Sequence, residues 1–585
     1  MKRPSGKNNM LNYKLATKSA EEIGNSENVW QEYPRPQMVR ENWINLNGIW
    51  EANGGAIRVP FPPESAFSLY TGKKSSRYVY KKTVCLTRLH EKERVLLHFG
   101  AVDQIAEVFV NKRRVGRHEG GYLPFALDVT DAISYEEENK IEVLVTDKLC
   151  KDYPYGKQRK KRGGMWYTPV SGIWKSVWIE QVPETYVERV KITPDQKGIY
   201  LEVFSNIEGM EKKVTIALHD GAKYETTFQE NAARIQMSEI ITENGENYVP
   251  RLWSPGDPYL YSMEITMGED TIRTYFGMRE IAFKEIQGQK RLCLNDEPIF
   301  LNGVLDQGYF PEGIYVPASE KEYEKDVLGI KALGFNLLRK HIKVEPEAFY
   351  YYCDLHGMLV MQDHVNNGGY SYLRDTALPG LGKLHIKDKY RITKKKRKDI
   401  FERHMIETQE SLYNHPSIIA YTIFNEGWGQ FDTNRMYNLA RENDNTRLYD
   451  SASGWFKQEK SDFDSRHWYG DPIQMKAEDK PLLISEFGGY TQAIAGHYFN
   501  QDNTYGYGVC ESQQELMRRI TKVYEEMIIP SIDEGGCGCI YTQVSDVEDE
   551  INGLYTYDRA VCKVDQQQMR ELQRRLEDKI REVTH

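Results

Sequence analysis

The sequence predicts two β-sandwich domains followed by a (β/α)8 (TIM) barrel, and three observations support this prediction. A chain of 585 residues is too long to fold around one hydrophobic core. Up to about residue 282, short runs alternate apolar and polar residues between turn signals, which is typical of antiparallel sandwiches. Beyond that point apolar runs alternate with helical segments, as a barrel requires.

The start of the chain, residues 1–28, is predicted to be an N-terminal extension. It carries positive charge but lacks the apolar core of a secretory signal, so we expect a cytoplasmic protein. The eight cysteines have no regular spacing, which predicts buried free thiols in a reducing compartment.

Two series of alternating runs define the predicted sandwiches, residues 29–183 and 184–282. The first series contains "RYVYKKTVCL", "RVLLHFGAV", "IAEVFVNKRRVG", "NKIEVLVTD" and "KSVWIEQV". The second contains "VERVKITPD", "GIYLEVFSN", "KVTIALHD", "YSMEITMG" and "TIRTYFGM". The second domain has about a hundred residues, which is compatible with an immunoglobulin-like sandwich.

The predicted barrel, residues 283–585, contains eight apolar runs that each end in polar residues or glycine. They are "PIFLNGVLDQG", "GFNLLRKH", "GMLVMQDH", "SIIAYTIFNEG", "TRLYDSAS", "SRHWYGD", "PLLISEFGG" and "GCIYTQVSD". Most are separated by helical stretches, so we expect eight βα units. Parallel barrel strands are buried along their length and carry functional residues at their carboxyl ends.

Two of these runs, the fourth and the seventh, end in an acid. Glu426 and Glu486 are therefore expected to face each other across the barrel mouth. Glycoside hydrolysis needs such a pair, because one carboxyl donates a proton to the leaving oxygen while the other attacks the anomeric carbon. Either acid alone could pair with an arginine or cap a helix, but together, with Asn425 and Trp428 beside one of them, they favour catalysis.

These segments resemble glycoside hydrolase family 2, which contains β-galactosidases, β-glucuronidases and β-mannosidases. "NEGWGQ" and "ISEFGG" are similar to its acid/base and nucleophile segments. Several earlier segments, such as "HEGGYLPFALDVT" and "GMWYTPVSGIWKSVWIE", are similar to its sugar-binding jelly roll. "LWSPGDPYLY" resembles the end of its immunoglobulin-like domain, and "GFNLLRKHIKVEP" resembles part of its barrel.

The resemblance implies a retaining double displacement with Glu426 as general acid/base and Glu486 as nucleophile. The two carboxyls are then expected roughly 5 to 5.5 Å apart. Since a pair this close does not readily hold two charges, Glu486 should be ionised while Glu426 holds the proton. Asn425 matches the family asparagine that bonds the sugar 2-hydroxyl.

Further residues at strand ends are expected to surround the sugar. Asp363 ends strand three, and Arg339 and His341 end strand two, where they could bind hydroxyls and hold the nucleophile. A structural ion pair across the barrel mouth is the alternative for these three. His467 and Tyr469 end strand six, and Tyr469 is the predicted partner of the nucleophile.

Two more positions complete the predicted site, which contains no metal and no organic cofactor. Asp306 ends strand one and is expected to reach a sugar hydroxyl. Trp428 is expected to form a wall beside the sugar, although a core position suits it nearly as well. Cys537 and Cys539 lack a second ligand pair, and no phosphate-binding loop occurs.

The glycone is predicted from a late barrel segment. The β-glucuronidases of the family carry an Asn-any-Lys pair there, whereas "EDEINGLYTYDR" has Asn552 but no lysine. This counts against glucuronate, and a neutral β-D-galactoside is the first expectation because it is the commonest activity among proteins that resemble this architecture. The basic group of Arg339, Lys340 and Lys343 leaves a β-uronide open, with β-galacturonidase ahead of β-glucuronidase.

Charge limits the other classes of function. A net charge of −9 argues against a nucleic-acid partner, and the basic runs 156–164 and 391–404 are interpreted as a solvated loop and helix face. No apolar window is long enough for a membrane span. A non-catalytic carbohydrate-binding protein would not need both acids. The expected partner is a glycoside or oligosaccharide substrate, and a homo-oligomer is left open.

Overall fold

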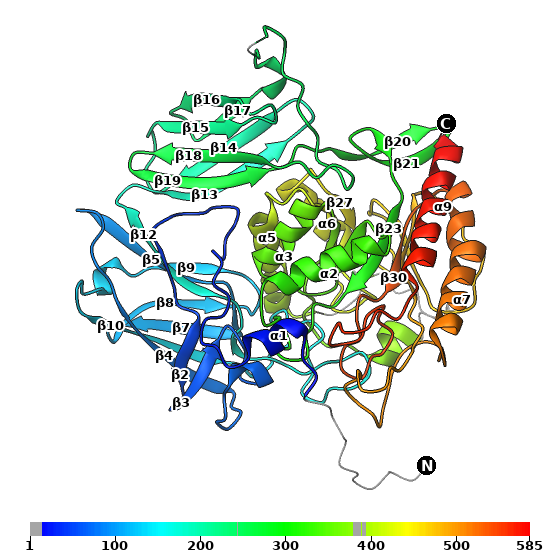
Figure 1. Ribbon diagram of the computed structural model, residues 1–585, viewed down its shortest axis with the longest axis horizontal. Coiled ribbons are helices and arrows are strands. Elements are labelled where there is room, and N and C mark those ends of the chain that lie inside the picture. The colour runs from blue at the N-terminus through cyan, green and yellow to red at the C-terminus, as the bar shows by residue number, and fades with distance from the viewer. Residues whose placement is uncertain (1–13, 243, 378–387, 389–392, 585) are drawn as a thin grey trace.

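Two β-sandwiches lie along one side of an eight-stranded barrel in the computed structural model (Figure 1). The structure describes residues 14–242, 244–377, 388 and 393–584. The jelly-roll, immunoglobulin-like and barrel order expected from the sequence is confirmed.

The first sandwich consists of a four-stranded and a six-stranded antiparallel sheet, with a short two-stranded ribbon. The four-stranded sheet has the order β1 (Trp43–Asn45), β12 (Val177–Pro183), β5 (Glu93–Phe99), β9 (Phe125–Asp128). The six-stranded sheet has the order β3 (Gly55–Val59), β2 (Gly48–Ala52), β4 (Arg77–Cys85), β10 (Glu138–Thr146), β7 (Ile105–Val110), β8 (Arg113–Glu119). The ribbon joins β6 (Val102–Asp103) and β11 (Gly172–Ile173). In β10 the alternation predicted from the sequence buries Ile141, Val143 and Val145 in the core of this domain.

The second sandwich packs a three-stranded sheet against a four-stranded one. The first has the order β13 (Val187–Pro194), β14 (Ile199–Ser205), β17 (Ala232–Ile235). The second has the order β16 (Lys223–Phe228), β15 (Lys212–Ala217), β18 (Tyr261–Met267), β19 (Asp270–Phe276).

A small sheet links this domain to the barrel. It contains β20 (Ile281–Ile286), β21 (Gln289–Leu294) and β22 (Glu297–Pro298). The proposed boundary between residues 282 and 283 falls inside β20, whereas the proposed boundary between 183 and 184 lies between β12 and β13. We keep both boundaries as proposals.

Each of the eight apolar runs of the barrel region contains or overlaps a parallel strand. In chain order these are β23 (Leu301–Asp306), β24 (Leu337–Lys340), β25 (Leu359–Asp363), β26 (Ile418–Thr422), β27 (Leu448–Asp450), β28 (Asp464–Trp468), β29 (Leu482–Gly488) and β30 (Gly536–Thr542). Each strand pairs with its neighbour and β23 pairs with β30, while β27 and β28 lie at the two ends of the sheet order. The barrel is thus nearly closed.

Helices follow most barrel strands, but not all of them. They are α2 (Lys321–Ala332), α3 (Glu347–His356), α5 (Lys395–Leu412), α6 (Thr433–Asn443), α7 (Gln513–Val523), α8 (Ile529–Asp533) and α9 (Gln566–Thr584). The expectation of eight βα units is wrong at two places, since the segments 451–463 and 469–481 contain no helix. Both segments are short; the first contains one glycine, three serines and one aspartate, and the second contains one glycine, two aspartates and two prolines, which favour turns.

Four other expectations concern the N-terminal extension, the second basic run, the cysteines and membrane spans. The described part of the N-terminal extension forms α1 (Lys18–Ile23), and Thr17 Oγ1 donates to Glu312 of the barrel domain at 2.8 Å. The second basic run is helical in α5, while its first two residues, 391 and 392, lie outside the described residues. All eight cysteines are free thiols, but Cys85 and Cys150 are exposed rather than buried. Within the described ranges, no helix has the length and apolar character that a bilayer crossing demands.

Candidate active site

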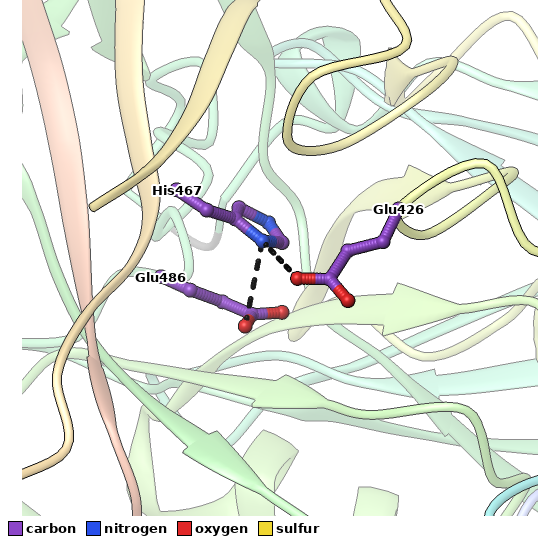
Figure 2. A group of neighbouring side chains, drawn as sticks. All are labelled: Glu426, His467 and Glu486. Atoms are coloured by element: carbon purple, nitrogen blue, oxygen red, sulfur yellow. Dashed lines mark hydrogen bonds and ion pairs between the residues drawn. The ribbon is translucent and has the colours of Figure 1, made fainter. Parts of the chain in front are cut away.

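The two acids predicted from the strand ends face each other in the structure (Figure 2). Glu486 is the fifth residue of the fully buried strand β29. Glu426 lies four residues beyond β26, in a turn where it adopts φ +50° and Gly427 adopts φ +68°. Two successive left-handed residues reverse the chain, and glycine permits this without steric cost at the second position. The turn is what aims Glu426 back over the barrel.

The carboxylates lie close together, with His467 beside both of them (Figure 2). One oxygen of each acid and one ring nitrogen of His467 all lie within 4.8 Å of one another. His467 Nδ1 is 3.0 Å from Glu426 Oε1 and 3.5 Å from Glu486 Oε2. Inverting glycosidases separate their carboxyls by roughly 6.5 to 9.5 Å and retaining ones by roughly 5 to 5.5 Å, so this spacing fits a retaining enzyme.

Hydrogen-bond donors surround Glu486 and keep it charged. Tyr469 donates its hydroxyl to Glu486 Oε2 at 2.6 Å, and Arg339 Nη1 lies 3.2 Å from Oε1. Burial alone would raise the pKa of Glu486, but the positive charges of His467 and Arg339, together with the Tyr469 hydrogen bond, lower it to about 2. Conversely, burial and the Glu486 charge raise the pKa of the Tyr469 hydroxyl.

Arg339 joins several strand ends through one guanidinium that is fully buried. Its Nε donates to Asp363 Oδ1 at 2.9 Å, and its Nη2 donates to Asn425 Oδ1 at 2.9 Å. Asp363 also accepts from His341 Nδ1 at 2.7 Å. Burial works to raise the pKa of Asp363, yet Arg339 and His341 bring it down to about 2. The ion pair weighed as the alternative for these residues is present, and it lies against Glu486.

The side-chain amide of Asn425 is hydrogen-bonded to the protein through its oxygen. Its Oδ1 accepts from Arg339 and from Ser453 Oγ at 2.6 Å, while within the described part of the chain its Nδ2 has no hydrogen-bond partner. The Nδ2 group is therefore available as a donor to a ligand. Ser453, which follows β27, was not identified from the sequence.

Asp306 belongs to a different charge network from the two acids. Its Oδ2 lies 2.6 Å from Lys340 Nζ, and Lys340 also pairs with Glu345. Gly308 N donates to Asp306 Oδ1 at 2.8 Å. Both carboxylate oxygens already accept hydrogen bonds from the protein, so contact of Asp306 with a sugar stays a prediction.

Trp428 is 2 % exposed and forms part of an aromatic cluster. Its ring meets Tyr155 at 5.4 Å, Trp166 at 5.1 Å and Tyr370 at 6.1 Å between centroids, all edge to face. Tyr155 and Trp166 come from the first sandwich domain. Trp428 is therefore buried among aromatic rings, as the alternative core position implied. This aromatic cluster lies next to Glu426, two residues before Trp428.

A segment of the first domain reaches the barrel mouth, which was not predicted. Arg162 Nη1 lies 2.7 Å from Asp549 Oδ1, Tyr167 donates its hydroxyl to Glu550, and Thr168 N donates to Glu548 Oε1 at 2.9 Å. These contacts span about 380 positions of sequence, and the basic run 156–164 was interpreted only as a solvated loop.

The same segment carries Lys157 toward the site. Burial raises the pKa of Glu550, and the positive charge of Lys157 partly offsets this effect. Lys157 also acts electrostatically on His341, whose pKa is lowered mainly by burial. Lys157 forms no ion pair with any residue in the described ranges, so its charge remains available at the mouth.

The cluster of Glu426, His467 and Glu486 has the residue types of a metal site, but its surroundings suit another task. Glu486 already accepts hydrogen bonds from Tyr469 and Arg339. A metal ion there would meet the Arg339 charge at close range. The donor set is that of a hydrogen-bonded carboxylate pair.

Comparison with known families accounts for nearly the whole chain. Residues 55–178 match the glycosyl hydrolase 2 galactose-binding domain-like family, residues 185–279 match glycosyl hydrolases family 2, and residues 285–563 match the family 2 TIM barrel domain. The chain belongs to glycoside hydrolase family 2. This confirms the resemblance seen in the sequence.

Relatives of this family 2 chain differ in their activities. It is 25 % identical to a β-galactosidase of Thermoanaerobacter pseudethanolicus over 58 % of this chain and 46 % of the relative. It is 24 % identical to a β-glucuronidase of Bacteroides fragilis over 80 % of this chain and 69 % of the relative. It therefore spans only about half the length of some curated relatives.

A solved structure shares the fold over almost the full length. The β-D-glucuronidase of Dictyoglomus thermophilum superposes with a TM-score of 0.68 at 18 % identity, covering 93 % of this chain and 98 % of that one. At this identity the likeness concerns the fold alone.

Proposed function

We propose that the protein is a retaining exo-β-glycosidase in which Glu486 is the nucleophile and Glu426 the general acid/base. The observation that carries this proposal is the spacing of the two carboxylates, whose nearest oxygens lie within 4.8 Å across one site. The donors around Glu486 support its role, because a pKa of about 2 leaves it ionised throughout the neutral range.

The reaction has two displacement steps. Glu486 attacks the anomeric carbon, the glycosidic C–O bond breaks, and Glu426 gives its proton to the leaving oxygen. This bond formation removes the charge of Glu486, so Glu426 loses its repulsive neighbour and can accept a proton from water. The water then attacks the anomeric carbon and releases Glu486. The free Nδ2 of Asn425 is suited to donate to the sugar 2-hydroxyl during both steps.

An exo mode of attack agrees with the walls of the site. The segment 155–168 of the first domain is bound to the barrel mouth through Arg162, Tyr167 and Thr168. Trp428 and its aromatic neighbours lie beside Glu426. A site walled in this way suits the end of a saccharide better than a chain that runs through it.

A neutral glycone, β-D-galactose, is our first candidate. The three cations that argued for a uronide are occupied: Arg339 pairs with Asp363 and Glu486, while Lys340 and Lys343 both pair with Glu345. They offer no spare charge for a substrate carboxylate.

A β-uronide remains the second candidate because of Lys157. Its ammonium is near enough to influence Glu550 and His341 and has no ion-pair partner within the described chain. A substrate carboxylate near Lys157 would form an ion pair with its ammonium, whereas the buried amide of Asn552 is already bonded to Gln543 and Glu550.

A panel of nitrophenyl β-glycosides, with galactoside, glucuronide and galacturonide, tests the proposal. We expect Glu486→Gln to abolish turnover of whichever substrate is cleaved, while the melting temperature stays near that of the wild type. Glu426→Ala should lose activity that azide restores, giving a β-glycosyl azide. An α-azide product, or full activity of Glu486→Gln, would overturn the assignment.

A further inference from the structure

A cavity of about 520 Å³ lies where the first domain meets the barrel mouth. Its volume is in the range typical of small-molecule sites, roughly 300 to 1,000 Å³. Five basic side chains line it together with three aromatic ones: Lys148, Lys151, Arg159, Lys160, Lys161, Tyr155, Trp166 and Tyr370.

None of these five cations forms an ion pair with a residue in the described ranges. Asp147 is close enough for Lys160 to lower its pKa slightly, but it lies outside ion-pair distance, and burial raises its pKa to about 6. By contrast, the neighbouring Arg162 is paired with Asp549 and Glu548. Five unneutralised cations around one cavity stand out in a chain with 86 acidic and 77 basic residues. All five side chains are exposed, so solvent screens part of their mutual repulsion, and an anion bound among them would reduce it further.

Two of the cations lie over aromatic rings of the lining. The Arg159 guanidinium lies 4.9 Å from the centre of the Trp166 ring, and Lys151 Nζ lies 5.9 Å from that of Tyr155. The cavity therefore combines charge with flat apolar surface.

The aromatic lining connects the cavity to the two catalytic acids. Trp166, Tyr155 and Tyr370 each contact Trp428, which follows Glu426 by two residues. Lys157 lies on the same segment, with its Nζ 5.8 Å from the Trp166 ring. A ligand bound in the cavity would thus lie next to the acid/base side of the active site, where the leaving group departs.

We propose that this cavity binds an anionic group, a sulfate or a carboxylate, carried by the aglycone of the substrate. The inference rests on the proposed glycosidase function. The chemical basis is charge attraction from the Lys and Arg side chains, with the aromatic rings packing against the sugar that bears the charge. The neutral-glycone site and the anionic-aglycone site would together select one end of an acidic saccharide.

Matched disaccharides test this proposal. They share the cleavable β-linked sugar and differ only at the reducing-end residue, which is neutral, sulfated or carboxylated. We expect kcat/KM to be about 5- to 50-fold higher for one or both charged forms at low salt, mainly through KM, and we expect 0.5 M NaCl to remove most of the difference. The sulfate and carboxylate arms distinguish which anion is bound.

Variants locate the effect. The triple variant Lys148→Gln, Lys160→Gln, Lys161→Gln should lose most of the preference for the charged aglycone and keep kcat/KM for the neutral disaccharide. These side chains make no hydrogen bond or ion pair with the described part of the chain, so the fold should not depend on them. The control triple variant Lys73→Gln, Lys74→Gln, Lys112→Gln removes the same charge from exposed positions of the same domain and should change neither value.

The results that would overturn the anionic-aglycone proposal differ from those that would overturn the glycosidase function. Equal kcat/KM for charged and neutral disaccharides in the wild type, or a preference that the triple variant retains, would overturn the proposal while leaving the glycosidase function intact. Oligonucleotide binding that depends on the three lysines, without a charged-aglycone preference, would also overturn it. If the wild type cleaves no glycoside of the panel, the glycosidase function itself fails.

Discussion

Replacing Tyr469 with Phe tests the donors that hold Glu486 in its ionised form. The substitution removes the hydroxyl that donates to Glu486 Oε2 at 2.6 Å. The ring itself should stay in place, because it is stacked on Tyr507 with 4.0 Å between centroids. The change removes this charge-assisted hydrogen bond and a weaker contact with Thr542 Oγ1 at 3.1 Å, which does not involve Glu486.

The size of the effect follows from that bond. A hydrogen bond to a charged group contributes about 1.5 to 3 kcal/mol, and 1.36 kcal/mol corresponds to one pKa unit. The pKa of Glu486 should rise from about 2 to about 3–4. In the proposed mechanism Glu486 must be ionised to attack, so activity falls as the pH drops through this pKa. The acid limb of kcat/KM should therefore move up by about 1 to 2 pH units.

Brief pH-jump assays on a nitrophenyl substrate measure this limb. Enzyme kept at pH 7 is diluted into acidic buffer, and a return to pH 7 shows that activity is recovered. Tyr505→Phe is the matched control, since its hydroxyl contacts that of Tyr507 at 3.4 Å and does not reach Glu486. An unmoved acid limb in Tyr469→Phe, or an equal shift in the control, would refute the reasoning.

Three further predictions concern the charges around the site. Arg339→Lys should lower the free energy of unfolding by about 3 to 5 kcal/mol in urea titrations, because a lysine cannot replace the planar guanidinium that pairs with the buried Asp363. A loss below 1 kcal/mol would contradict this. Lys157→Gln should lower kcat/KM for a β-uronide about tenfold or more and change that for a β-galactoside less than about threefold; equal effects on both would remove Lys157 as a glycone determinant. Arg162→Gln should increase hydrogen exchange in residues 156–168 without changing exchange in β29, because it breaks the contact with Asp549; unchanged exchange would show that the contact does not hold the segment.

The fold was predictable because each domain has its own periodicity. Buried parallel strands such as β26 and β29 lie in apolar runs, and each of the eight runs recognised in the sequence contains or overlaps a barrel strand. The absence of a helix after β27 and after β28 was not predicted, because a regular βα repeat was expected throughout the barrel. The segments 451–463 and 469–481 contain several turn residues, and these residues were the local sequence signal against a helix.

The site was predictable where its residues end strands, and not where distant segments meet. Glu486, Tyr469 and Asn425 are brought together as expected from strand order. The contact of Arg162 with Asp549 joins positions 387 apart, and no local pattern encodes it. The basic composition of the run 156–164 was the one sequence signal for this contact. A solvent-exposed loop accounts for the same composition, so the signal did not indicate the contact. The cytoplasmic location and the oligomeric state stay predictions.

The different donors of the two acids argue for their different roles. Glu486 lies between the guanidinium of Arg339 and the hydroxyl of Tyr469, both of which donate hydrogen bonds and therefore favour a charged carboxylate. Glu426 has His467 as its hydrogen-bond partner and is the more exposed acid, with 15 % of its side chain accessible against 7 % for Glu486. A proton on Glu486 would compete with these two donors, whose effect together with that of nearby positive charges keeps the pKa of Glu486 low. Reversing the proposed roles would require a protonated Glu486 against Arg339, so the position of Arg339 supports the proposed assignment of acid and nucleophile.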